Sequence, residues 1–161
     1  MDSNIKSPYI IPNGEGYHIV IPTDITKIEE FGFLGADVET VILPENITVI
    51  GRGAFMGSQI KNIVLPDSLS EIADDAFSAC VNLQKVYLPA SLTVIGARAF
   101  MGCDKLETVI IPEKIQFIGD EAFAFCRSLR NITLPEKIKK IGKEVFHKCP
   151  SNPPKTLNLE P

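Results

Sequence analysis

The chain has 161 residues, enough for one domain, and it is 45% hydrophobic and 22% charged, as expected of a soluble globular protein. Its net charge of −4 argues against nucleic acid as the main partner, and no run approaches the roughly 18 apolar residues of a membrane-inserted helix. The first ten residues contain neither an apolar signal-peptide core nor a small-residue cleavage site, so we expect no secretory signal in this chain.

The first predicted element is a hairpin. Tyr9–Pro12 and 17–21 are β-prone segments on either side of the Gly-containing turn 13–16. After it, a proline preceded by Ile or Leu returns every 22 or 23 residues. These prolines are Pro22, Pro44, Pro66, Pro89, Pro112 and Pro135. A period of this size implies a solenoid or a propeller built from stacked units.

The residues before each of these prolines predict a short strand. In the segment 83–89, Val86 and Leu88 point to one face, whereas Lys85 and Tyr87 point to the other. Pro89 removes a hydrogen-bond donor and ends the strand. Equivalent segments begin at Gly16, Val38, Ile60, Leu106 and Leu129. We therefore expect one short parallel strand in each 22–23-residue coil.

The remainder of each coil predicts a buried second side. Apolar pairs such as Leu92 and Ile95 precede a small residue, and then a small residue precedes a phenylalanine. The phenylalanines share one register: Phe33, Phe55, Phe77, Phe100, Phe123 and Phe146. Because one coil is too small to bury its own ring, the rings are expected to stack from coil to coil.

Solenoid ends need caps with a polar outer face. We interpret residues 1–21 as an N-terminal cap, 22–149 as the repeats and 150–161 as a C-terminal cap, all within a single domain, 1–161. Leu157 and Leu159 imitate the Val-x-Leu spacing of the repeats and predict a last strand in the C-terminal cap.

Taken together, the coils read approximately L-P-x-x-L-x-x-I-G-x-x-A-F-x-x-C-x-x-L-x-x-V-x-L-P. This pattern resembles the BspA-like class of leucine-rich repeats over about residues 16 to 149. The resemblance implies a right-handed, mostly β leucine-rich repeat solenoid with a concave sheet and with short turns or helical pieces on the convex side. It also implies a secreted or cell-surface protein engaged in adhesion, whereas the lack of a signal leaves a cytoplasmic location open.

Two stripes of side chains are predicted on the outward face of the concave sheet. The first is mostly apolar: Val20, Ile42, Val64, Tyr87, Ile110 and Thr133. The second is polar: His18, Thr40, Asn62, Lys85, Thr108 and Asn131. The apolar stripe is explained either by β-propensity alone or by a contact surface for a partner.

Four cysteines occupy one register: Cys80, Cys103, Cys126 and Cys149. A single zinc ion suits them poorly, because thiols in a line span more than one tetrahedral site reaches. Disulfides between neighbouring coils fit the expected Cα separation, but parallel side chains suit the disulfide torsion badly. The interpretation we favour is a small buried apolar position, because Ala36 and Ser58 occupy it in earlier copies.

Residues suited to catalysis are sparse. His147 lies near Cys149, but that cysteine holds a core register, and His18 lies on the predicted sheet. The acidic pairs at 29–30 and 74–75 fall in variable surface turns and are expected to be solvated. We therefore predict no enzyme activity, no catalytic residues, no metal site and no cofactor.

The predicted function is a non-enzymatic binding or adhesion module whose concave sheet holds a protein or glycan partner, such as host extracellular matrix. The alternative is a structural module that self-associates through its ends. Residues 1–80 hold 12 acidic and 4 basic residues, whereas 81–161 hold 8 acidic and 12 basic residues. Opposite charge at the two ends favours head-to-tail association, capture of an anionic glycan by the basic end, or simply solvated caps.

Overall fold

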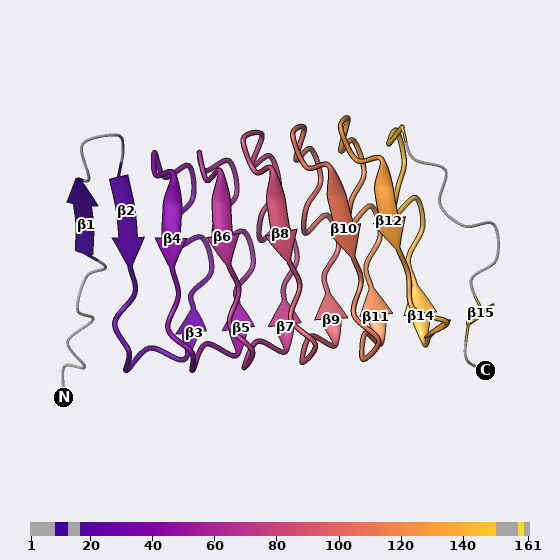
Figure 1. Ribbon diagram of the computed structural model, residues 1–161, viewed down its shortest axis with the longest axis horizontal. Coiled ribbons are helices and arrows are strands. Elements are labelled where there is room, and N and C mark those ends of the chain that lie inside the picture. Colours follow the sequence, from indigo (N-terminus) through magenta and orange to yellow (C-terminus); the bar gives the residue numbers. More distant parts are fainter. Residues whose placement is uncertain (1–8, 13–16, 151–157, 160–161) are drawn as a thin grey trace.

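The computed structural model describes residues 9–12, 17–150 and 158–159, and in these the chain winds into a parallel β-solenoid (Figure 1). The coils follow one another along the long axis, from β1 at one end to β14 at the other. None of the described residues lies in a helix, so the side opposite the longer strands consists of turns and very short strands. This is the leucine-rich repeat architecture that the sequence pattern predicts.

The longer strands form the first sheet, in the order β1-β2-β4-β6-β8-β10-β12. Its strands are β1 (Tyr9–Pro12), β2 (Tyr17–Val20), β4 (Thr40–Ile42), β6 (Asn62–Val64), β8 (Lys85–Tyr87), β10 (Thr108–Ile110) and β12 (Asn131–Thr133). From β2 onward all neighbours are parallel, as predicted. The middle residue of each of β4, β6, β8 and β10, for example Ile63 or Val86, is buried, because alternate side chains point to opposite faces; in β12 the middle residue is partly buried.

The predicted N-terminal hairpin is present. β1 pairs antiparallel with β2, with Tyr9 opposite Val20 and Pro12 opposite Tyr17. The connecting residues 13–16 lie outside the described residues. β1 therefore adds one strand to the first sheet beyond the first complete coil, whereas among the described residues the second side of that coil ends at β3 (Lys27–Ile28). The division of the chain into caps and repeats stays a prediction.

A second sheet, which the sequence pattern did not predict, runs along the other side of the coils. Its order is β14-β11-β9-β7-β5-β3. These strands are β3 (Lys27–Ile28), β5 (Val49–Ile50), β7 (Glu71–Ile72), β9 (Val94–Ile95), β11 (Phe117–Ile118) and β14 (Lys140–Ile141). Each has only two residues, too few to show an alternating pattern in the sequence.

The glycines after these strands are required by close packing. A Cβ on Gly51 would lie 2.6 Å from the carbonyl oxygen of Ile28, and one on Gly119 would lie 2.3 Å from the backbone nitrogen of Ala97. Neither residue has a positive φ. The small residue is therefore needed because the preceding coil lies directly beneath it, and Ala73 shows that a methyl group is accommodated at one such junction.

The phenylalanine column is the centre of the core. Neighbouring rings are stacked with centroids 5.1–5.7 Å apart and interplanar angles of 2–16°. The four inner rings are fully buried, whereas Phe33 and Phe146 at the two ends of the column are partly buried. The predicted stacking is confirmed, and each of the four inner rings is covered by the coils on either side of it.

The turn that carries the column, residues 30–36 in the first coil and its equivalents, contains two residues with positive φ in each coil. The second lies four positions after the first, as in Arg98 (φ 53°) and Gly102 (φ 71°). Outside glycine, this conformation is unfavourable for L-residues. Ala79, Phe125 and Lys148 nevertheless adopt it, because the hydrogen bonds between coils hold the turn in place.

The last predicted strand is present in part. Asn158–Leu159 form β15, which pairs in parallel with β13 (Lys137–Ile138) in a two-stranded sheet of its own. Leu157 lies outside the described residues. Within the described residues β15 therefore does not extend the first sheet, whose order ends at β12.

Candidate binding surface

The two predicted stripes lie side by side on the outward face of the first sheet. In the polar stripe each residue stands opposite its equivalent in the next strand, as His18 does with Thr40. Every member of both stripes is at least partly exposed. The apolar members are unusually open to solvent: Ile42 53%, Val64 75%, Tyr87 72% and Ile110 61%. Four consecutive coils thus present one uncovered apolar side chain each.

A groove of about 580 Å³ lies at the centre of this apolar stripe. Tyr87 and Ile110 line it from β8 and β10, together with Pro112 from the following turn. Lys85 and Glu107 are also part of its lining. An apolar lining with a few charged groups is typical of a site that binds and orients a ligand.

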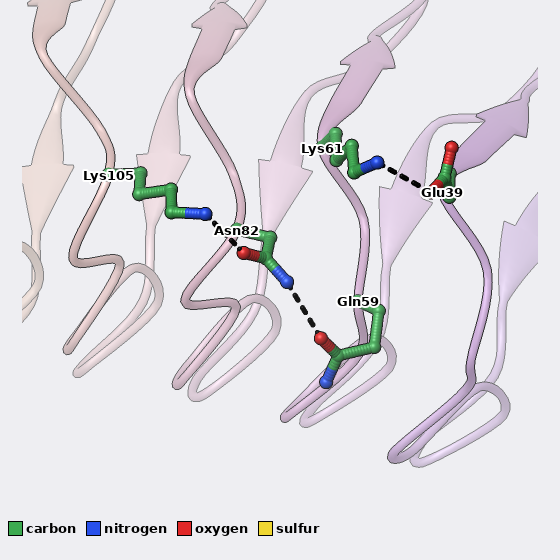
Figure 2. A network of polar contacts seen from close by, with 5 residues as sticks. All are labelled: Glu39, Gln59, Lys61, Asn82 and Lys105. Atoms are coloured by element: carbon green, nitrogen blue, oxygen red, sulfur yellow. Dashed lines mark hydrogen bonds and ion pairs between the residues drawn. The ribbon is translucent and has the colours of Figure 1, made fainter.

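A row of polar side chains follows the turns just before the first-sheet strands (Figure 2). Asn82 Nδ2 donates to Gln59 Oε1 at 2.7 Å, and Lys105 Nζ donates to Asn82 Oδ1 at 2.7 Å. In the same region Lys61 Nζ pairs with Glu39 Oε1 at 2.5 Å. These bonds connect side chains 22 or 23 residues apart, so they tie neighbouring coils together beside the stripes.

The cysteines form a buried ladder of hydrogen-bond donors. Each thiol donates to the carbonyl oxygen of the phenylalanine in the preceding coil, at 3.0–3.2 Å. All four are free thiols; Cys80, Cys103 and Cys126 are buried and Cys149 is partly buried. Burial raises the pKa of Cys80 to about 11, against the opposing effect of its hydrogen bond with Ser58. The position is buried as predicted, but its thiol is a polar link between coils.

The carboxylates of the surface turns are partly structural, which corrects the expectation that they are solvated. Asp74 Oδ1 accepts the backbone N–H of Ala97 at 2.7 Å. Asp75 accepts two hydrogen bonds from the Arg98 guanidinium, at 2.9 and 3.0 Å. Sequence reasoning missed these contacts, because partners 23 residues apart share no local motif.

The remaining chemistry-bearing residues lie apart from the groove. His18 lies on β2 and is partly exposed, whereas His147 packs edge-on against Phe125 with centroids 5.4 Å apart. Among the described residues, no group of three or more His, Cys, Asp or Glu is arranged to hold a metal ion. Nor do these residues include a helix with the length and hydropathy needed to cross a membrane.

The repeated coil, the stacked phenylalanines and the parallel first sheet define a leucine-rich repeat solenoid. The family described as BspA type leucine-rich repeat region matches residues 26–152 in six copies. The chain therefore belongs to this family, as the sequence pattern indicated. No curated protein matched the chain in a sequence search.

Solved structures with the same fold come from several bacteria. A leucine-rich repeat protein from Bacteroides ovatus is 31% identical, with a TM-score of 0.78 over 82% of this chain and 35% of that one. The T. pallidum leucine-rich repeat protein is 27% identical, with a TM-score of 0.71 over 96% and 92%. A leucine-rich cell surface protein from Faecalibacterium prausnitzii is 26% identical, with a TM-score of 0.79 over 94% and 47%. This chain thus spans about a third of the first structure and about half of the third.

Proposed function

We propose that this chain is a non-enzymatic binding module that holds a protein partner on the outward face of the first sheet. The observation that carries the proposal is the exposure of Ile42, Val64, Tyr87 and Ile110 in four consecutive coils. β-propensity explains branched and aromatic residue types in strands, but it gives no reason for four such side chains to lie uncovered in one continuous row beside a groove. Contiguous exposed apolar side chains usually mark a contact with a partner.

The spacing of the stripe favours a protein over a glycan. Successive coils are separated by about the distance between stacked rings, 5.1–5.7 Å. An α-helix rises about 5.4 Å per turn, so a helix laid along the solenoid places one apolar side chain on each coil. Tyr87 and Ile110 then serve as central anchors, and the polar stripe forms one rim of the contact.

Membership of the BspA-type family supports a role in binding or adhesion. The related Faecalibacterium protein is described as a cell surface protein, and we extend that location to this chain as part of the proposal. Host extracellular matrix proteins are therefore the first partners to test.

The test compares capture of solubilised extracellular matrix and host surface proteins by the immobilised wild type and by the double variant Tyr87→Ala/Ile110→Asp. Loss of two central anchors is expected to weaken binding by at least tenfold, since each truncation of such a residue typically costs 1 kcal/mol or more. Both side chains are exposed, so thermal unfolding of the variant should match that of the wild type.

A matched control carries equivalent changes away from the first sheet. Val81 and Phe117 are 40% and 42% exposed, and Val81→Asp/Phe117→Ala is expected to retain binding. Unchanged capture by the Tyr87/Ile110 variant would refute the proposed surface. Capture that survives protease treatment of the ligand but is lost after periodate oxidation would assign a glycan in place of the protein.

A further inference from the structure

The two ends of the solenoid expose complementary rows of backbone groups. Between every pair of coils, three N–H groups of one turn donate to three carbonyl groups of the next, as Glu121, Phe123 and Phe125 do to Lys143, Val145 and His147. Within the described residues no coil precedes the first turn, and none of their donors reaches its carbonyl oxygens. These belong to Glu30, Gly32 and Leu34.

The last turn shows the opposite pattern. The N–H groups of Glu144, Phe146 and Lys148 occupy the donor register of the repeat, and no carbonyl among the described residues accepts from them. One end of the solenoid therefore presents three acceptors and the other end three donors, in the same order and with the same spacing along the turn. This is the pairing that already joins each coil to its neighbour.

The aromatic column and the charges match in the same way. Phe33 and Phe146 are the partly buried ends of the column, and Phe33 lines a depression of about 370 Å³ with Leu34 and Asp37. Lys143 and Glu30 are both exposed and share one register of the repeat, so docking the ends sets a positive side chain against a negative one. Asp37 adds negative charge at the first end, whereas at the last end Lys148 adds a positive charge beside the negative Glu144.

From these observations we infer that the chain self-associates head to tail, with turn 143–149 of one copy docking on turn 30–36 of a second copy. The junction continues the phenylalanine stack and repeats the three backbone hydrogen bonds that join neighbouring turns within one copy. Because the two contact surfaces differ, the association is heterologous and produces chains, or a ring where the rotation closes, rather than a two-fold symmetric dimer. This surface is separate from the groove at Tyr87 and Ile110.

Two features control the geometry and strength of the junction. β1 lies between the first-sheet strands of the two copies and β15 lies beside β13 on the last coil, whereas no described strand lies between the turns themselves. The copies therefore meet at an angle opened by one strand spacing, about 4.8 Å. Glu29 also occupies the register of Gly51 and Gly119, where a Cβ approaches the backbone of the preceding coil. Glu29→Gly is therefore expected to strengthen the association.

Sedimentation velocity of the full chain at low and high salt tests the inference. Wild type is expected to form concentration-dependent oligomers larger than a dimer at low salt and to dissociate as salt rises. Lys143→Glu and Glu30→Lys each set like charges against one another, and each alone is expected to associate roughly tenfold more weakly.

Mixing these two variants is the decisive step. In the mixture, Lys143→Glu tails meet Glu30→Lys heads, and the unchanged tails meet the unchanged heads, so association should return to about the wild-type level. Restoration also shows that both variants fold. A wild type that stays monomeric at low salt and high concentration would overturn the inference, as would single variants that associate like wild type or a mixture that fails to recover.

Discussion

Removal of one ring from the middle of the phenylalanine column is the most direct test of how the fold is held together. Phe77 is fully buried and stacks on Phe55 at 5.3 Å and on Phe100 at 5.2 Å. Phe→Ala changes in cores typically cost 3–5 kcal/mol, and stacked pairs add about 0.5–1.5 kcal/mol beyond the buried area. With two such pairs lost, Phe77→Ala is expected to lie near the upper end of that range.

Phe33→Ala provides the internal comparison. This ring is partly buried and has one stacking partner in the described residues, Phe55 at 5.2 Å. Its loss should cost roughly half as much, about 2 kcal/mol. Equilibrium urea unfolding followed by circular dichroism measures both values, and a reduced m-value for Phe77→Ala would indicate that the two halves of the solenoid unfold separately. Equal costs for the two variants would show that stacking between coils does not carry the stability.

Two further predictions concern the turns and the cysteine ladder. Ala79 is exposed and has a φ of 58°, and glycine occupies the same position of the coil at Gly57 and Gly102. Ala79→Gly should therefore stabilise the fold by about 1 kcal/mol and raise Tm by roughly 2–4 °C. The control Ala122→Gly, at a buried position without positive φ, should lower Tm. The pKa of Cys80 is raised from 9.0 to about 11 in the folded state, so its contribution to stability is complete below pH 9 and is lost as pH rises towards 11. Urea unfolding at pH 8, 9, 10 and 11 should show this loss of stability, and the loss should be smaller in Cys80→Ser. A Cys80→Ser variant with the same pH dependence as the wild type would refute the role of the Cys80 thiol.

Most residues of the candidate surface could be predicted from the sequence, because the copies of the repeat can be aligned with one another. Once the prolines set the register, the outward positions of β8 and β10 followed from strand alternation, which placed Tyr87 and Ile110 on the same face. The groove between them was not predictable in this way. Its lining combines residues of β8 and β10 with residues of the turns that follow them, such as Ala90 and Pro112, so its volume depends on how neighbouring turns are placed in space.

The sequence by itself determined the coil length, the parallel order of the longer strands and the phenylalanine column, because each is a pattern repeated at a constant interval. Only the tertiary structure decided the second sheet, the thiol bonds to the phenylalanine carbonyls and the contact of Asp74 with the next coil. The same holds for the two end rows, which have no partner among the described residues. Each of these depends on the separation and angle between stacked coils, and no stretch of sequence encodes that distance locally.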